Sequence, residues 1–410
     1  MKILVLSDYF MPLSNAERVA YLMTKEYVNL GHEVVVITSN DELKNGEVKK
    51  ITYNNIQIYQ IGSSYNRYLR PYIGLYNPWV IKAIKIIMKN KHFDFAHIHN
   101  IHAHISYSVI SLLKRIGIKQ IMTAHDYMSI DYGKFTQGIN PSDFSENPKI
   151  NPKLSLLKTF ITNKRSAINP FRNFLIKYYL YKLEKIVTVS KSQEFILNSN
   201  GIKNTLTINN GISVFIESVD LKKITEFKDK YNIKSDEKVI LWAGRLSKQK
   251  GAEQVEKVLL KLIDNNFKVK LLLAGGDIFD NPKLNDHIIS PGWLNEEQMR
   301  LVFDIADLVL VPSIYPDPFP TVVLEAMQSG TPAVVTCFGG ASEAVSNNVT
   351  GRVINPFNIE IFFKSVQEII TNEKLHSSMS NESKKKFNKF FSIDSCVKRY
   401  LDLMQKSAKM

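Results

Sequence analysis

The chain has few cysteines and no long apolar run, and both absences narrow the classes of protein to which it can belong. Its 410 residues include only Cys337 and Cys396, which provide no disulfide framework and fit no metal-binding knuckle. A reducing cytoplasm is therefore the expected compartment. No apolar stretch reaches the roughly 18 residues of a membrane-spanning helix. The start, MKILVLSDYF, lacks the apolar core and the cleavage site of a signal peptide.

Residue patterns that hold metal ions are also scarce. No aspartate-rich D-x-D pattern follows a predicted strand, so we expect chemistry that requires no metal. The stretch HIHNIHAH contains His97, His99, His102 and His104, and its two H-x-H pairs raise the alternative of a zinc site. No cysteine, and no nearby acid except Asp94, completes such a site. Structural or acceptor-facing histidines are the favoured interpretation.

Positive charge is concentrated in the first half of the chain. Residues 1–212 carry 27 Lys and Arg against 14 Asp and Glu, whereas residues 213–383 carry 18 against 23. Segment 149–185 has nine basic residues and one acid, with Leu, Phe and Tyr between them. This composition is typical of a helix that lies on an anionic membrane surface. Two alternatives stay open: an ordinary solvated lysine-rich surface, and a long helix that packs on the first domain.

Alternating strand and helix patterns predict an α/β protein with parallel sheets. The strand KILVLSDY, the helix AERVAYLMTKEYVNLG and the strand HEVVVITS form a βαβ unit, and Gly31 is placed to end the helix. The pattern continues to residue 212, and a second series starts near residue 238. We therefore expect two doubly wound domains, 1–212 and 213–385. Segment 133–170, with four prolines, is expected to be an irregular loop or flap of the first domain.

Two loops of the second domain carry the residues that predict a phosphate site. In WAGRLSKQKG, Arg245 and Lys250 lie between a strand that ends at Gly244 and the helix that follows. Ligands of doubly wound domains bind where strands end at their carboxyl side. Two cations beside a helix N-terminus can bind phosphate without a metal. A merely solvated basic loop is the alternative.

The second loop is DPFPTVVLEAM, after the strand DLVLVPS. Pro320 suits the first helical position, which leaves backbone amides at the positive end of the helix dipole to hold a diphosphate. The residues concerned are Phe319, Pro320, Thr321 and Val322. Glu325, about one turn into the helix, is placed to accept the hydroxyls of a ribose. Asp317 would reach the sugar. A buried, paired or capping acid is the alternative for Glu325.

At these residues the chain resembles the retaining glycosyltransferases of family four, which have the two-domain GT-B fold. GRLSKQKG, DPFPTVVLEAMQSGTPAVVT and GGASEAVSNNVTGRVINP carry the resemblance in the second half. AERVAYLMTKEYVNLGHEVVVIT, FDFAHIHN, TAHDY, IVTVSKS and INNGIS carry it in the first half, in the expected order. The resemblance implies an acceptor-binding first domain and a donor-binding second domain across a cleft, with residues 386–410 as a C-terminal helix that returns to the first domain.

The resemblance also implies roles for single residues. Arg245 and Lys250 would bind the donor diphosphate and Glu325 the ribose, while Asp317 matches the first acid of the E-x7-E pair of the family. His125 in TAHDY matches the histidine near the donor sugar. Gly339, Gly340 and Glu343 match a loop that lines the cleft.

One departure concerns the loop after the first strand. The family usually has a Gly-Gly pair there, and this chain has Ser14 and Asn15. Asn tolerates a left-handed backbone, but neither residue lets a ligand approach as glycine does. The geometry of the acceptor or the donor at this loop is therefore in question.

The function implied is a metal-independent hexosyltransferase. It would move a sugar from a nucleotide-diphosphate sugar to a lipid-linked glycan at the inner face of the cytoplasmic membrane, in cell-surface polysaccharide or glycoconjugate assembly. A non-catalytic GT-B relative that binds a polyanion or a partner protein is the alternative. No nucleic-acid recognition motif is present, so no nucleic-acid partner is expected.

Overall fold

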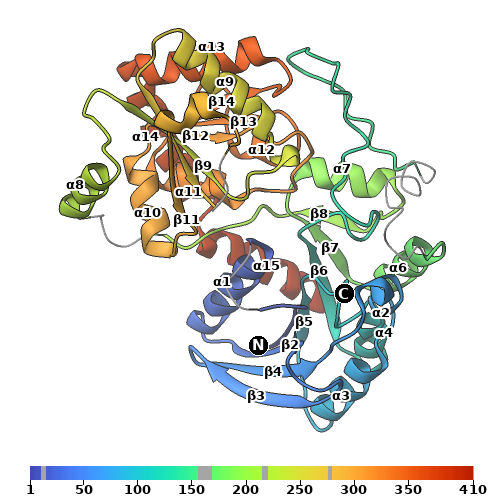
Figure 1. The fold of residues 1–410 in the computed structure, drawn as a ribbon. Coiled ribbons are helices and arrows are strands. Elements are labelled where there is room, and N and C mark those ends of the chain that lie inside the picture. The colour runs from blue at the N-terminus through green and yellow to red at the C-terminus, as the bar shows by residue number, and fades with distance from the viewer. Residues whose placement is uncertain (11–14, 156–168, 215–219, 276–278, 410) are drawn as a thin grey trace. The chain divides into compact units, whose positions relative to one another are not determined.

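The computed structural model describes residues 1–10, 15–155, 169–214, 220–275 and 279–409, and these residues form two compact units. The first unit contains Met1–Gln137, Pro152–Gly211 and Ile393–Met410. The second unit contains Gly138–Asn151 and Ile212–Ser392. Figure 1 shows a twisted sheet with helices on its faces in each unit, as alternating strands and helices predict.

The sheet of the first unit has eight strands in the order β3-β4-β2-β1-β5-β6-β7-β8. All neighbouring strands run parallel except β3, which pairs antiparallel with β4 at one edge. The strands are β1 (Lys2–Leu6), β2 (Glu33–Asn40), β3 (Val48–Tyr53), β4 (Ile56–Gly62), β5 (Phe95–Ile98), β6 (Lys119–Ala124), β7 (Lys185–Thr188) and β8 (Thr205–Thr207).

The helices of the first unit begin at residues that favour helix starts. Asn77 accepts a hydrogen bond from the amide of Val80 at the start of α3, and Ser190 accepts one from Gln193 at the start of α7. The helices are α1 (Asn15–Asn29), α2 (Arg70–Ile73), α3 (Pro78–Met88), α4 (Ser108–Arg115), α6 (Arg172–Leu180), α7 (Lys191–Ser199) and α15 (Ile393–Lys409), with the 3₁₀ turn η1 (Arg67–Leu69).

The sheet of the second unit has six parallel strands in the order β11-β10-β9-β12-β13-β14. They are β9 (Lys238–Ala243), β10 (Val269–Ala274), β11 (Ile288–Gly292), β12 (Leu308–Val311), β13 (Ala333–Thr336) and β14 (Gly351–Ile354). Its helices are α8 (Leu221–Lys230), α9 (Ala252–Asp264), α10 (Glu296–Ile305), α11 (Thr321–Ser329), α12 (Ala341–Ala344), α13 (Ile359–Thr371) and α14 (Glu373–Phe390), with the 3₁₀ turns η2 (Lys248–Lys250) and η3 (Pro282–His287).

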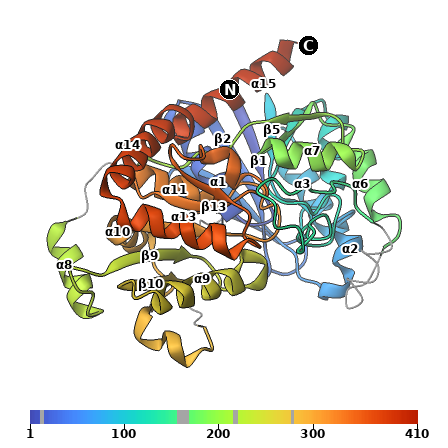
Figure 2. The same cartoon turned by 90° about the horizontal axis from the view of Figure 1, so that it is seen from above.

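The core of the second unit explains why its strands are continuous apolar runs. Helices α9 and α13 lie side by side over one face of the sheet (Figure 1 and Figure 2), and their apolar stripes pack against the strand side chains between them. Val258 from α9, Phe362 from α13 and Leu271 from β10 are each at most 1% exposed. Burial on both faces removes the alternation of polar and apolar residues that a half-exposed strand shows.

Segment Gly138–Asn151 belongs to the second unit, which corrects the assignment of 133–170 to the first domain. The reason is a set of side-chain to backbone hydrogen bonds. The Asn355 amide donates to the carbonyls of Asp143 and Ser145 at 2.7 and 2.8 Å, and the Asn358 amide donates to the carbonyl of Phe144 at 3.0 Å. Residues 133–137, 152–155 and 169–170 of the predicted flap do belong to the first unit, and residues 156–168 lie outside the described residues.

The C-terminal helix joins the first unit, but it begins later than expected. The chain leaves the second unit after Ser392 rather than near residue 385, because α14 is one continuous helix that packs on α11. Within the first unit α15 packs on α1 and β6, and the Tyr400 hydroxyl lies 3.0 Å from the hydroxyl of Thr123. No helix among the described residues is long and apolar enough to cross a membrane.

Candidate active site

Three neighbouring strands of the second unit, β9, β12 and β13, end at the loops that the sequence singles out. Because parallel strands end at the same sheet edge, these loops converge there. The loop after β9 contains Arg245 and Lys250, and the loop after β12 contains Asp317 and leads into α11. The loop after β13 contains Gly339 and Gly340 and leads into α12. The predicted donor residues are therefore gathered at one edge of one sheet.

Two close backbone contacts hold the first two loops together. The amide of Ile314 donates to the carbonyl of Gln249 at 2.9 Å. Gly251 has a φ of +89°, and a Cβ atom there would lie 2.1 Å from the carbonyl oxygen of Pro312. Only glycine permits both this conformation and this approach. The glycine in SKQKG therefore fixes Lys250 against the loop that follows β12.

The glycine pair after β13 lies directly on the DPFP turn. The amide of Gly340 donates to the carbonyl of Asp317 at 2.8 Å. A Cβ atom at Gly340 would lie 2.1 Å from the carbonyl oxygen of Pro318, and one at Gly339 would lie 2.3 Å from that of Asp317. The two loops therefore form one packed unit that sets the position of the Asp317 backbone.

Lys250 and Asp317 form an ion pair inside this cluster. The Lys250 ammonium lies 2.5 Å from Oδ2 of Asp317, and the Tyr315 hydroxyl donates to the same oxygen at 2.8 Å. The two side chains are 29% and 11% exposed, so water screens the pair only in part. Lys250 also lies 5.7 Å from the Tyr315 ring centroid. The sequence assigns these residues to different parts of a donor, and the structure places their charges in contact.

Helix α11 begins one residue later than predicted. Pro320 has a ψ of 119° and occupies the N-cap position, so Thr321 rather than Pro320 is the first helical residue. Pro320 provides no side-chain oxygen to cap the helix, and the first amides of a helix have no acceptor within it. The amides of Thr321 and Val322 can therefore donate to an anion. The Phe319 ring is buried against Phe391, with ring centroids 5.9 Å apart.

Glu325 lies one turn into α11 and is 7% exposed. A carboxylate at this depth is stable only where it is hydrogen-bonded or paired, and Glu325 does interact with another group. On the neighbouring loop, Gly244 has a φ of +122° and no atom within 4 Å of its would-be Cβ. Glycine is therefore required here by the positive φ and not by lack of space for a side chain. Arg245 follows it and is exposed.

In the first unit, His125 belongs to a row of three histidines at the ends of β5 and β6, in which His97 and His99 are fully buried and His125 is half-buried. Nδ1 of His99 lies 2.9 Å from Nε2 of His125, and their rings stack with centroids 5.2 Å apart. The rings of His97 and His99 are 4.1 Å apart at their centroids. The Tyr27 hydroxyl and the Thr123 hydroxyl lie 3.1 and 2.8 Å from the two ring nitrogens of His97.

Burial keeps all three histidines neutral near pH 7. It lowers the pKa of His125 to about 4 and the pKa of His97 to about 3. Burial lowers the pKa of His99 well below its usual value, and the neighbouring histidines lower it further. A neutral ring both donates and accepts one hydrogen bond. His125 is therefore suited to hydrogen-bond a neutral ligand rather than to bind an anion.

Asp8, which sequence reasoning missed, anchors the loop after β5. Its carboxylate accepts hydrogen bonds from the amides of Ala103, His104 and Ile105 at 2.7–2.8 Å, and it is 2% exposed. The signal available in the sequence was an acid directly after a buried strand, in LSDYF. Its partners are backbone amides about 95 residues away in the sequence, and no sequence motif indicates these contacts.

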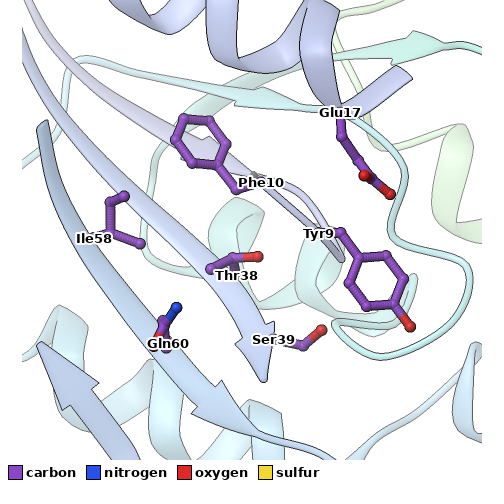
Figure 3. A pocket seen from close by; sticks show the side chains of 7 residues that line it. All are labelled: Tyr9, Phe10, Glu17, Thr38, Ser39, Ile58 and Gln60. Atoms are coloured by element: carbon purple, nitrogen blue, oxygen red, sulfur yellow. The ribbon is translucent and has the colours of Figure 1, made fainter. Parts of the chain in front are cut away.

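A cavity of about 300 Å³ opens in the first unit beside the end of β2 (Figure 3). Two aromatic rings and an isoleucine line part of it, and a carboxylate, two aliphatic hydroxyls and an amide line the rest. The lining residues are Tyr9, Phe10, Glu17, Thr38, Ser39, Ile58 and Gln60. Rings beside carboxylate and hydroxyl groups are suited to a sugar-like ligand, because sugars present apolar faces and polar edges.

The other predicted residues lie on α1, on α12 and in the loop after β5, or outside the described residues. Ser14 lies outside the described residues, and Asn15 is the first residue of α1. Glu343 lies on α12, where its backbone carbonyl accepts a hydrogen bond from Lys386 at 3.4 Å. His102 is 3.8 Å from Asp126, and the Nδ1 atom of His104 lies 3.0 Å from the Ser63 hydroxyl. His102 and His104 thus contact partners other than the neighbouring rings of His97 and His99.

The fold and these loops match known proteins over most of the chain. A family model of Glycosyltransferase Family 4 matches residues 16–214, and a model of Glycosyl transferases group 1 matches residues 223–386. The chain belongs to the family-four, group 1 glycosyltransferases, as the sequence motifs predicted.

Curated relatives are similar over part of their length. The chain is 29% identical over 244 residues to an uncharacterized glycosyltransferase of Methanocaldococcus jannaschii, which is 56% of this chain and 62% of that protein. It is 30% identical over 188 residues to a putative glycosyltransferase, YtcC, of Bacillus subtilis, which is 42% of this chain and 46% of that protein. The matches thus span less than two thirds of either relative.

Solved structures confirm the GT-B fold. A sucrose-phosphate synthase from Thermosynechococcus elongatus superposes with a TM-score of 0.72 at 16% identity, over 99% of this chain and 98% of that one. Anabaena HepE in complex with UDP-glucose superposes with a TM-score of 0.69 at 16% identity, over 99% of this chain and 100% of that one. At these identities the likeness establishes the fold.

Proposed function

We propose that this protein is a retaining glycosyltransferase that moves a sugar from a nucleotide-diphosphate sugar to a hydroxyl acceptor. The observation that supports this most strongly is the convergence of Lys250, Asp317, the uncapped start of α11 and Glu325 at adjacent strand ends of one sheet. A cation, free amides and a buried carboxylate are the groups that bind a diphosphate and a ribose.

In this proposal the bond between the anomeric carbon and the diphosphate oxygen breaks, and the nucleoside diphosphate leaves with the bonding electrons. The acceptor oxygen bonds to the same face of the sugar, and its proton passes to the departing phosphate oxygen. Lys250, Arg245 and the amides of Thr321 and Val322 would stabilise the charge that develops on the leaving group. Asp317 and His125 would position the sugar. These groups supply the charge stabilisation, so the proposed reaction requires no metal.

The acceptor in this proposal is a lipid-linked glycan, and the place of action is the inner face of the cytoplasmic membrane, during assembly of cell-surface polysaccharide or glycoconjugate. Two observations support it. The first half of the chain is strongly basic. A lipopolysaccharide 1,2-N-acetylglucosaminetransferase of Salmonella typhimurium is 25% identical to this chain over 194 residues. The cavity beside Tyr9 would hold part of the acceptor.

A calorimetric titration with UDP, GDP, ADP and their common sugars tests the donor site. We expect one nucleotide to bind at micromolar strength, and Glu325→Ala to weaken it about 10- to 100-fold through the loss of charge-assisted hydrogen bonds to ribose. Glu373→Ala, which removes an exposed acid in the first turn of α14 of the same unit, is the control and should leave the affinity within about threefold. Absence of binding to the wild type would favour a non-catalytic relative. Retention is tested separately, by the anomeric proton coupling of the product in NMR.

A further inference from the structure

Helix α6 of the first unit carries a row of exposed aromatic side chains. Phe171, Phe174, Tyr178 and Tyr181 are 69, 72, 55 and 75% exposed. Their spacing of three, four and three residues places them on one side of the helix and its two ends. Large exposed rings are unfavourable in water unless another surface covers them.

The opposite side of α6 holds the helix in the fold. Arg172, Ile176 and Leu180 are buried, and α6 packs on α4. The Arg172 guanidinium lies 4.7 Å from the Tyr132 ring centroid, and the Asn173 amide donates to the carbonyl of Ile130 at 2.7 Å. The residues that hold α6 in the fold are therefore different from the four exposed aromatic residues.

A second aromatic segment lies beside the first. Helices α2 and α6 are neighbours in both views (Figure 1 and Figure 2), and the Asn169 amide, just before α6, lies 3.5 Å from the carbonyl of Pro71 in α2. Tyr72 and Tyr76 on and after α2 are 49% and 54% exposed. We refer to these two tyrosines and the four residues on α6 as the aromatic patch.

Cations surround the aromatic patch. The Lys182 ammonium lies 3.9 Å from the Tyr178 ring centroid, and Arg67 lies 5.3 Å from that of Tyr68, next to α2. Lys177 lies on α6 itself. In the surrounding sequence, residues 149–185 carry nine Lys and Arg and one acid. Such a surface is complementary to one that is both anionic and able to accept rings.

We propose that the aromatic patch docks the protein on an anionic membrane surface. The rings would enter the headgroup region with the tyrosine hydroxyls toward water, and the surrounding cations would meet lipid phosphates. Aromatic rings interleaved with cations distinguish this surface from an ordinary solvated helix face. The inference deepens the proposed function, because it would bring the first unit to a lipid-linked acceptor, but the docking itself rests only on this surface.

Sedimentation of the full chain with lipid vesicles tests the proposal. Vesicles of phosphatidylcholine alone are compared with vesicles containing 30% phosphatidylglycerol, at 50 and 300 mM NaCl. We expect binding to the anionic vesicles only, with about fivefold weaker binding for each lipid-facing cation that is removed, for example in Arg67→Gln. Phe174→Ser/Tyr181→Ser should weaken binding about tenfold or more, because it removes apolar area that enters the lipid.

Phe195→Ser/Trp293→Ser is the matched control. Phe195 and Trp293 are 57% and 72% exposed, and both lie outside the aromatic patch. This variant should bind vesicles as the wild type does. Calorimetric titration of all variants with nucleotide keeps the two proposals separable. Normal nucleotide affinity with no vesicle binding overturns the docking proposal alone, whereas vesicle binding without nucleotide affinity overturns the proposed function alone.

A second copy of the chain is the competing occupant of the aromatic patch. Analytical ultracentrifugation without lipid decides this point. A dimer that Phe174→Ser/Tyr181→Ser converts to a monomer would overturn membrane docking as the role of the patch. Equal loss of vesicle binding in the control variant would overturn it too, because the loss would then not depend on this surface.

Discussion

Replacing Lys250 by methionine should expose the cost of leaving Asp317 without its cation. Methionine retains most of the length and apolar character of the lysine stem and removes the ammonium. Among the described residues, Asp317 would then keep the hydrogen bond from the Tyr315 hydroxyl, which donates to it at 2.8 Å. The Asp317 residue is 8% exposed, so water can replace the lost partner only in part.

The expected magnitude follows from this intermediate burial. Exposed ion pairs stabilise a protein by about 0–1 kcal/mol. Removing one partner of a fully buried pair costs about 3–5 kcal/mol. With side chains that are 29% and 11% exposed, the Lys250–Asp317 pair lies between these cases. We expect Lys250→Met to lower the free energy of unfolding by about 2 kcal/mol, between the exposed and buried values.

The double variant Lys250→Met/Asp317→Asn should recover part of this loss, because it also removes the unpaired charge. The three variants and the wild type form a cycle with an expected coupling energy of about 1–2 kcal/mol. Denaturant unfolding followed by tryptophan fluorescence provides the measurement. A Trp79→Phe background restricts the signal to the second unit, where Trp242 is 3% exposed. Additive effects, within about 0.5 kcal/mol, would mean that the charges of Lys250 and Asp317 do not stabilise each other.

Three further predictions concern the rest of the fold. Gly340→Ala should destabilise the second unit by about 1–3 kcal/mol in denaturant unfolding, because its Cβ would lie 2.1 Å from the carbonyl oxygen of Pro318. Gly133→Ala is the control and should be neutral, because no atom lies within 4 Å of its would-be Cβ. Equal effects of the two variants would mean that the close approach at Gly340 does not require glycine. The free energy of unfolding should be highest above pH 6.5 with respect to these histidines and should fall as the pH drops toward 4. Burial gives His125 and His97 folded-state pKa values of about 4 and 3, whereas the unfolded chain binds their protons near pH 6.5. The free energy of unfolding should change by up to about 1.4 kcal/mol per pH unit for each histidine. An unfolding midpoint that stays constant between pH 7.5 and 5 would exclude this contribution of the histidines. Asn355→Ala should speed limited proteolysis within 138–151, because two hydrogen bonds to that segment are lost. Asn147→Ala is the control. Unchanged cleavage in both variants would refute the role of Asn355.

The alternation of strands and helices and the strand-end loops were predictable because local patterns encode them. KILVL and HEVVVITS are apolar runs, and Gly31 ends the intervening helix with a φ of +79°. The edge strand β3 was missed because VKKITY is mostly exposed and alternates weakly. The very short β8, with three residues, gives almost no signal of its own.

Contacts between distant residues were beyond the sequence patterns. Nothing in SKQKG or DPFP indicates that Lys250 and Asp317 touch, because they are 67 positions apart and each also suits a ligand. Segment 138–151 is held on the second unit through its backbone carbonyls, which accept hydrogen bonds from Asn355 and Asn358. Every residue carries a backbone carbonyl, so the sequence of the segment does not indicate this contact. In segment 149–185, composition predicted a basic and aromatic surface, whereas the row of exposed rings on α6 required the helix bounds.

Hydrogen exchange would show whether a nucleoside diphosphate binds at the start of α11, as the proposed function requires. Amide exchange of peptides across the second unit is compared by mass spectrometry with and without the nucleotide that calorimetry selects. We expect slower exchange in the peptide that spans Ser313–Ser329, where the amides of Thr321 and Val322 would donate to phosphate, and in the peptide that contains Lys250. Protection confined to other parts of the chain, with nucleotide saturating, would contradict it.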